Sequence, residues 1–170
     1  MKILGLPGVK SETEKWMRDL LSALQEIPFD FEIAQYRHWS DDHDPDINHE
    51  AGCLTDLSVD IVIAKSLGTV ISTLAFDSFN FRPEKAIFIG SPLRRHCTNN
   101  YEMLSEFVNS VPTLFIQQTS DFNGSYRELS KIVQSFQNGT IVEVPGKDHV
   151  YDDIIGLQKI MLQILSGSSK

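Results

Sequence analysis

Ser66 is the residue whose type and surroundings point most directly to chemistry. It lies in the run A-K-S-L-G at 64–68, which follows an apolar stretch and leads straight into a helical one. This layout is typical of a nucleophile elbow, G-x-S-x-G, with alanine at the first glycine position. Small residues on both sides allow close backbone packing, and the N-terminus of the next helix favours developing negative charge. The alternative is that Ser66 only caps that helix.

A serine nucleophile needs a base and a group that orients the base. His149 follows the last strand-like run, in V-E-V-P-G-K-D-H, and Asp121 follows the run T-L-F-I-Q-Q. Because the carboxyl ends of parallel strands meet at one edge of a sheet, we expect both side chains near Ser66. We therefore predict Ser66 as nucleophile, His149 as base and Asp121 as orienter. Asp148 is adjacent to His149 in sequence and is not expected to face it.

The remaining histidines and two further aspartates receive other interpretations. Four histidines lie in polar stretches with no strand end nearby and are interpreted as surface residues: His38, His43, His49 and His96. Of these, His49 and His96 could still line the rim of the site. Asp152 and Asp153 are expected to cap the last helix.

An acyl-transfer intermediate also needs two backbone N–H groups to bind its oxyanion. We predict one from Leu67, directly after the nucleophile, and one from the segment L-P-G-V that follows the first strand. Val9 is the preferred donor in that segment and Gly8 the alternative. Pro7 and Gly8 could instead form only a turn.

The elements that must position these residues alternate between apolar runs and amphipathic runs. Strands are predicted at 2–6, 29–36, 59–64, 85–89, 113–117 and 140–144. Helices are predicted at 12–24, 47–56, 67–76, 101–108, 125–136 and 152–165. Ser11 and Glu14 form a capping-box pattern at the start of the first helix. Short apolar strands separated by helices predict an α/β three-layer sandwich with a doubly wound parallel sheet.

Composition limits the class of protein. The 170 residues predict one domain over 1–165 and a disordered tail at 166–170. A net charge of −8 argues against a nucleic-acid partner, and no apolar run approaches a membrane span. Cys53 and Cys97 lack metal-ligand spacing and are interpreted as free thiols, so no metal and no cofactor are expected. The apolar run at the N-terminus is too short for a signal peptide, which predicts a cytoplasmic protein.

With A-K-S-L-G, S-D-F and K-D-H in place, the chain resembles the α/β-hydrolase superfamily, close to its small serine hydrolases that lack a lid. The resemblance covers residues 2 to about 165. It implies the strand order 2-1-3-4-5-6, with the first two strands of larger members missing. It also implies that Ser66 attacks an acyl carbonyl while His149 acts as base and then as acid.

Three positions depart from the pattern of that superfamily. Ala64 replaces the usual glycine, Lys65 replaces a common histidine, and Pro7 replaces the histidine of a usual histidine-glycine pair. No triad member is lost. The expected function is therefore carboxylesterase-like cleavage of small acyl esters, with thioesterase or amidase action on the same triad as alternatives.

The expected partner is a small-molecule acyl substrate, with no nucleic acid and no membrane; oligomeric state is not predicted. Aromatic residues and one histidine are candidate walls of the site: Trp39, His96, Tyr101, Phe122 and Tyr151. A non-catalytic hydrolase-like binding module remains an alternative. Nucleotide binding is not favoured, because the run G-L-P-G-V-K-S lacks the glycine that a P-loop needs before its lysine.

Overall fold

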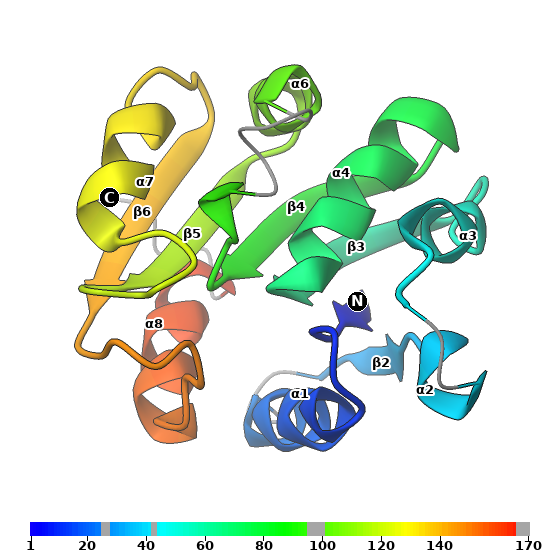
Figure 1. The fold of residues 1–170 in the computed structure, drawn as a ribbon, viewed down its shortest axis with the longest axis horizontal. Helices are drawn as coiled ribbons and strands as arrows, with labels where there is room; N and C mark the ends of the chain where they lie inside the picture. The colour runs from blue at the N-terminus through cyan, green and yellow to red at the C-terminus, as the bar shows by residue number, and fades with distance from the viewer. Residues whose placement is uncertain (25–27, 42–43, 95–100, 166–170) are drawn as a thin grey trace.

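Six parallel strands form one sheet in the order β2-β1-β3-β4-β5-β6 (Figure 1). The computed structural model describes residues 1–24, 28–41, 44–94 and 101–165. The strands are β1 (Lys2–Leu6), β2 (Asp30–Ile33), β3 (Ser58–Lys65), β4 (Arg82–Ile89), β5 (Thr113–Gln118) and β6 (Gly139–Val144). The predicted fold class and strand order are confirmed.

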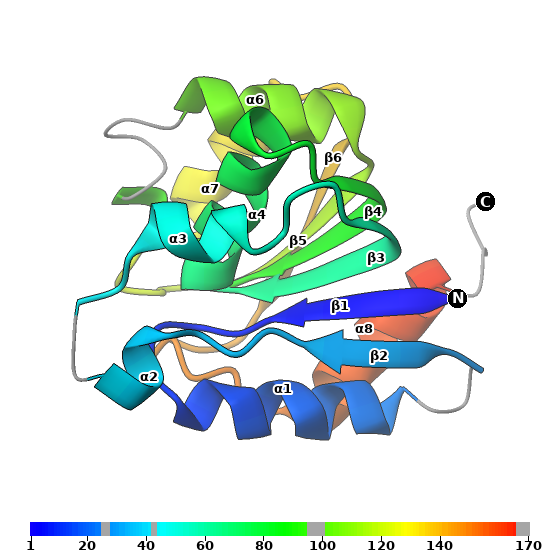
Figure 2. The same cartoon turned by 90° about the vertical axis from the view of Figure 1, so that its right-hand side faces the viewer.

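Helices cover both faces of this sheet (Figure 2). One face carries α1 (Glu12–Ala23) and α8 (Ile154–Leu165), and the other carries α4 (Leu67–Ser78), α6 (Tyr101–Ser110) and α7 (Tyr126–Val133). The short helices α2 (His38–Asp41) and α3 (Ile47–Gly52) follow β2. Within the described residues, no helix has the length and hydropathy of a membrane span.

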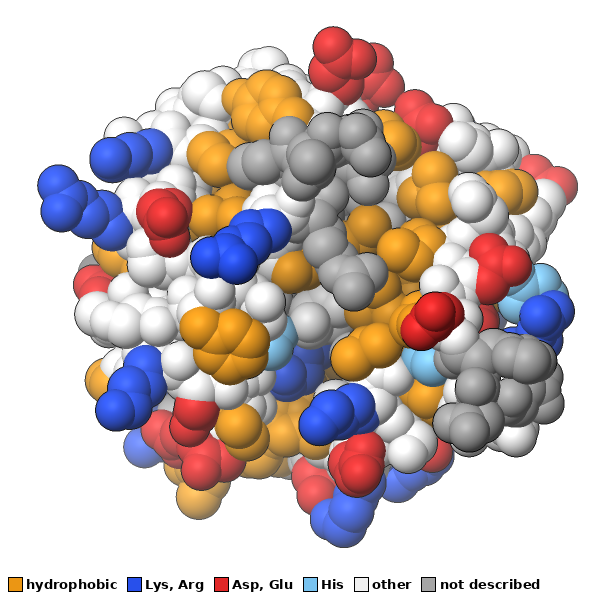
Figure 3. Space-filling model, in the orientation of Figure 1, with side chains coloured by type: hydrophobic (Ala, Val, Ile, Leu, Met, Phe, Trp, Pro, Cys, Tyr) orange, Lys and Arg blue, Asp and Glu red, His pale blue; other side chains and the backbone are white. Residues whose placement is uncertain are grey.

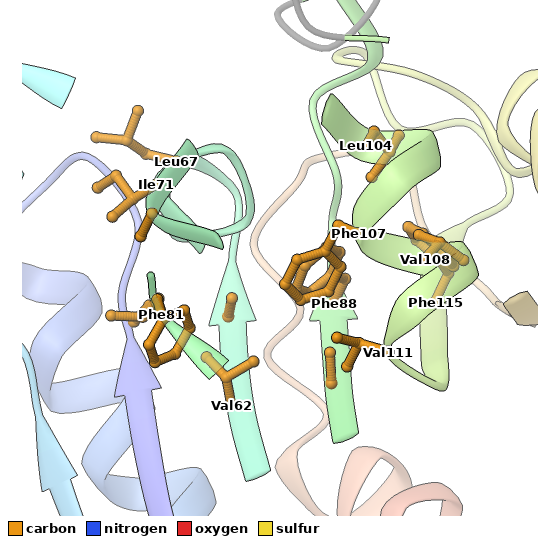
Figure 4. Packing of buried hydrophobic residues seen from close by; sticks show 14 of the residues in the cluster. Val62, Leu67, Ile71, Phe81, Phe88, Leu104, Phe107, Val108, Val111 and Phe115 are labelled. Carbon is orange, nitrogen blue, oxygen red and sulfur yellow. The ribbon is translucent and has the colours of Figure 1, made fainter. Parts of the chain in front are cut away.

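Two hydrophobic clusters fill the spaces between the sheet and its helices. The larger one lies under α4, α6 and α7, where Phe88 stacks on Phe107 with ring centroids 5.2 Å apart (Figure 4). The other lies under α1 and α8 and includes Met17, Leu20 and Leu21, whose spacing places them on one side of α1. Because both faces of the central strands are covered, β3 and β4 each contain an unbroken run of four buried apolar residues, at 61–64 and 86–89.

The capping boxes at the starts of α1 and α7 differ from what the sequence predicts. The capping box predicted at Ser11 is wrong, because Ser11 already has helical backbone angles and makes no side-chain cap. Glu14 instead accepts a hydrogen bond from Arg18 at 2.7 Å. A complete capping box occurs at the start of α7, where Ser125 and Glu128 each bind the backbone N–H of the other. There the backbone of Ser125 is extended, as a capping residue requires.

The observed bounds of several strands also differ from the predicted ones. The strand predicted at 29–36 is only Asp30–Ile33, because its last residues leave the sheet and lead into α2. β4 begins earlier than predicted, at Arg82, because Ser58 at the start of β3 pairs with it. β3 and β5 end one residue later than predicted, at Lys65 and Gln118, and β6 ends at Val144 as predicted, so the predicted site residues still follow the carboxyl ends of these strands.

Candidate active site

Ser66 occupies a tight turn between β3 and α4. Its backbone has φ 50° and ψ −113°, a conformation that non-glycine residues rarely adopt. A Cβ on Gly68 would come within 2.2 Å of the Leu6 carbonyl oxygen, so only glycine lets α4 approach β1 this closely. Ser66 makes no side-chain cap to α4, so it is not merely a helix cap. The strand–turn–helix arrangement predicted for 64–68 is therefore present.

The structure brings together the three side chains predicted as nucleophile, base and orienter. His149 Nε2 lies 2.8 Å from Ser66 Oγ, and His149 Nδ1 lies 2.7 Å from Asp121 Oδ2. A carboxylate only accepts hydrogen bonds, so Nδ1 carries a proton and the neutral ring leaves Nε2 free to accept the serine proton. The Asp121 side chain is fully buried and that of His149 is 12% exposed. This arrangement can deprotonate a serine hydroxyl.

Asp121 is held in its charged form by several donors. Tyr151 donates its hydroxyl to Asp121 Oδ2 at 2.8 Å, and the Asn123 N–H donates to Oδ1 at 2.9 Å. Burial acts to raise the pKa of Asp121, but the hydrogen bonds from His149, Asn123 and Tyr151 outweigh it, so the pKa is lowered. The carboxylate therefore stays ionised opposite the histidine ring.

The loop that carries His149 is fixed from two strands. His149 and Tyr151 both have φ 62°. Gln118, at the end of β5, accepts the His149 N–H at 2.9 Å and donates to Asp148 at 3.1 Å. Lys65, at the end of β3, donates to the His149 carbonyl at 3.0 Å. These supporting roles could not be predicted from the sequence, because no local pattern links residues that meet only through the sheet.

Lys65 is unusual because its side chain is almost entirely buried. Its ammonium lies over the rings of Trp16 and Tyr151, 5.3 and 5.5 Å from their centroids. Burial lowers the pKa of Lys65 to about 8, although the charges of Asp121 and Asp148 act to raise it. A lysine here therefore changes charge within the range in which enzymes are assayed.

The predicted oxyanion donors lie beside the serine. Gly8, Val9 and Leu67 line the same cleft as Ser66. Leu67 is the first residue of α4, so its N–H has no acceptor within the helix. In the described part of the chain, no hydrogen bond engages the N–H of Gly8 or of Val9. Both remain candidates for the second donor.

The cleft around Ser66 has a volume of about 510 Å³. Its lining is Gly8, Val9, Lys10, Glu12, Thr13, Trp16, Lys65, Ser66, Leu67, Pro92, Phe122, Asn123, Asp148, His149 and Val150. Apolar side chains form much of its rim, with Phe122 63% exposed and Val150 50% exposed. Figure 3 shows a hollow in this face, where histidine and basic side-chain atoms lie below surrounding hydrophobic groups.

Of the predicted wall residues, Phe122 lines this cleft. Trp39 and Tyr151 lie behind the lining, where Trp39 binds the Val9 carbonyl and Tyr151 binds Asp121. Tyr101 lies away from the cleft and packs against Phe136. His96 falls outside the described residues.

Among the other histidines, the surface interpretation of His38 is wrong. Its side chain is only 7% exposed, because it packs against Tyr36 and binds the Val9 carbonyl. His49 is exposed on α3 and does not line the cleft, and His43 lies outside the described ranges. Cys53 is a free, exposed thiol, and Cys97 is again outside them. In residues 1–24, 28–41, 44–94 and 101–165, no group of three or more His, Cys, Asp or Glu side chains is placed to bind a metal ion.

Comparisons with known proteins find similarity in structure only. No protein-family model and no curated protein sequence matches the chain. An α/β serine hydrolase homologue from Coxiella burnetii is 15% identical, with a TM-score of 0.74 over 97% of this chain and 85% of that one. Est1E from Butyrivibrio proteoclasticus, solved with ferulic acid bound, is 14% identical, with a TM-score of 0.66 over 97% and 89%. A thioesterase domain from the curacin biosynthetic pathway is 10% identical, with a TM-score of 0.66 over 95% and 90%.

Identities this low establish the fold alone. The matches extend over nearly all of this chain and most of each structure, so they concern the whole sheet and not a shared fragment. The observed strand order agrees with the order that the resemblance of the sequence implies. The protein therefore has the α/β-hydrolase fold.

Proposed function

We propose that the protein is a serine hydrolase that cleaves small acyl esters through an acyl-enzyme on Ser66. The observation that carries the proposal is the hydrogen-bonded chain from Ser66 through His149 to Asp121. The strained backbone at Ser66 supports it, as do the N–H groups of Gly8 and Val9, for which the described residues show no hydrogen bond. A module that only binds ligands would have no need of this alignment.

The proposed reaction has two halves. His149 Nε2 takes the Ser66 proton as the oxygen attacks the ester carbonyl, and Asp121 stabilises the resulting imidazolium. The N–H groups of Leu67 and Val9 hold the oxyanion, and His149 then protonates the leaving alcohol. In the second half, His149 activates water, which releases the acid and restores the serine. No cofactor takes part.

The shape of the cleft supports a small or medium acyl ester as substrate. A volume of about 510 Å³ and an apolar rim suit such a molecule. Among the similar structures, one holds ferulic acid and another is a thioesterase domain, so thioester cleavage by the same triad is the alternative to carry into a substrate panel. The proposed partner is accordingly a small molecule.

Hydrolysis of p-nitrophenyl acetate and butyrate by the purified protein tests the proposal. We expect saturable activity in the wild type and a fall to near the uncatalysed rate in Ser66→Ala. Ser72→Ala is the matched control, because Ser72 is buried in α4 and its hydroxyl has no partner among the described residues. Equal activity in wild type and Ser66→Ala, or no activity of folded wild type on esters and thioesters alike, would contradict it.

A further inference from the structure

Three side chains from one short segment hold the loop that carries the second oxyanion donor. Tyr36 donates its hydroxyl to the Pro7 carbonyl at 3.0 Å. His38 Nε2 and Trp39 Nε1 both donate to the Val9 carbonyl, at 2.7 and 2.9 Å. A carbonyl oxygen only accepts, so the Nε2 of His38 carries a proton. The segment 36–39 therefore binds the loop at two successive anchor points, one on each side of Gly8.

These anchors restrict the peptide group between them. The N–H of Val9 belongs to the planar Gly8–Val9 peptide, which lies between the anchored Pro7–Gly8 and Val9–Lys10 planes. Gly8 on its own gives the backbone wide conformational freedom. With both neighbouring carbonyls held, the Gly8–Val9 plane has little room to rotate. The direction of the Val9 N–H is thus set by side chains that do not line the cleft.

The segment 36–39 is itself firmly packed. The Tyr36 ring contacts those of His38 and Trp39, with centroids 5.6 and 4.9 Å away. Glu50, buried on α3, accepts the Arg37 N–H at 2.8 Å, and its Oε1 lies 3.7 Å from His38 Nδ1. The ring contacts and the Arg37–Glu50 hydrogen bond restrict the segment 36–39, as positioning of an oxyanion donor requires.

We infer that His38 and Trp39 are positioning residues of the oxyanion hole, acting through the Val9 carbonyl. The inference rests on the proposed hydrolase function and adds to it the part of the fold that prepares the second donor. It also selects Val9 over Gly8 as the donor whose orientation these residues control. Neither residue lines the cleft, so we expect their loss to weaken stabilisation of the transition state and to leave substrate binding nearly unchanged.

Steady-state kinetics on p-nitrophenyl butyrate test this inference. Trp39→Phe keeps the ring and removes one donor, and His38→Leu removes the other. We expect kcat to fall about tenfold in each and about 100-fold in the double variant, approaching the 10²- to 10³-fold loss typical of one missing oxyanion donor. KM should change less than about twofold. His38→Gln, which retains a donor, should recover most of the loss.

Two controls separate this role from general damage and from failure of the proposed function. His49→Leu makes the same change at an exposed histidine outside the cleft and should leave kcat unchanged. Circular dichroism at the assay temperature identifies any variant that does not fold. If His38→Leu does not fold, Trp39→Phe serves as the test. Wild-type activity with unchanged kcat in Trp39→Phe, or equal kcat in His38→Gln and His38→Leu, would overturn the inference. A folded wild type that is inactive and that also fails to react with a fluorophosphonate, a reagent for activated serines, would instead overturn the hydrolase proposal.

Discussion

At the scale of single residues, Asp121 makes the most specific contribution to the site. Its Oδ2 accepts a hydrogen bond from the protonated Nδ1 of His149 and thereby selects the ring tautomer in which Nε2, which faces Ser66, carries no proton. In Asp121→Asn the amide can instead donate to Nδ1, which would place the ring proton on Nε2. We expect kcat on p-nitrophenyl butyrate to fall by about 10³- to 10⁴-fold.

The matched control is Asp152→Asn, which makes the same change at an exposed aspartate in the loop after His149. It should retain activity within about twofold. If Asp121→Asn kept more than a tenth of wild-type kcat while remaining folded, Asp121 would not be the orienter.

Lys65 predicts a dependence of stability on pH. Its pKa is about 8 in the folded protein and 10.5 in an unfolded chain, since burial disfavours the ammonium. Between these values the unfolded chain binds a proton that the folded one does not, so the free energy of unfolding rises with pH. Below pH 8 both states are protonated and this gain is absent. The full gain is about 3 kcal/mol, reached only at and above pH 10.5.

Urea unfolding of wild type and Lys65→Met between pH 7 and 10 measures this effect. The difference between the two proteins cancels groups that they share, including the tyrosines. We expect the free energy of unfolding of the wild type, minus that of the variant, to increase as the pH rises above 8. Parallel curves would mean that Lys65 is not buried as a charge.

The three residues proposed as the triad could be predicted from sequence because each lies at or shortly after the carboxyl end of a strand, Ser66 after β3, Asp121 after β5 and His149 after β6. The residues that support them could not be predicted from the sequence, for a physical reason. Lys65 and Gln118 read as ordinary strand residues, and their bonds to the His149 loop exist only once β3 and β5 are in one sheet. His38 looked like a surface residue because its own segment is polar, whereas Val9 and Glu50 enclose it in three dimensions.

At the scale of elements, the turn between β3 and α4 depends on Gly68. In Gly68→Ala the new methyl would meet the Leu6 backbone, which cannot move without distorting β1. We expect the free energy of unfolding, measured with urea, to fall by about 3 kcal/mol.

Gly52→Ala provides the comparison, because its Cβ would meet the Phe79 ring at 3.5 Å, an ordinary contact at the end of α3. That change should stabilise the protein by up to about 1 kcal/mol. Similar losses for both variants would argue against close packing of α4 on β1.

Element starts show where sequence patterns mislead. Ser11 and Glu14 satisfy the capping-box spacing, yet the backbone at Ser11 is already helical and Glu14 pairs with Arg18. Ser125 and Glu128 have the same spacing with an extended cap residue, and there the box forms. The spacing was equally good at both sites, and only the backbone entering the helix distinguishes them.

At the scale of the whole molecule, two hydrophobic clusters share one sheet, so they should unfold together. Phe107→Ala removes a fully buried ring from the cluster under α6, at a cost of about 3–5 kcal/mol. We expect Trp16, on the opposite face, to report the same lowered urea midpoint as far-UV circular dichroism. Trp39→Phe as background leaves Trp16 as the sole tryptophan.

Phe122→Ala, at an exposed ring, should change the free energy of unfolding by less than about 0.5 kcal/mol. Separate midpoints for the two probes in Phe107→Ala would show that the faces unfold independently.

The fold itself was predictable from six short apolar runs alternating with helices, because parallel strands need crossovers and covered faces. The strand predicted at 29–36 is longer than the observed β2, since Ala34 and Tyr36 are apolar because they pack against the larger cluster.

Mass spectrometry after treatment with a fluorophosphonate tests whether Ser66 is an activated nucleophile, because the reagent labels activated serines. We expect one adduct per chain, on the peptide that contains Ser66, with no adduct in Ser66→Ala and a strongly slowed reaction in His149→Ala. Folded wild-type protein that stays unlabelled, or an adduct on a serine other than Ser66, would contradict it.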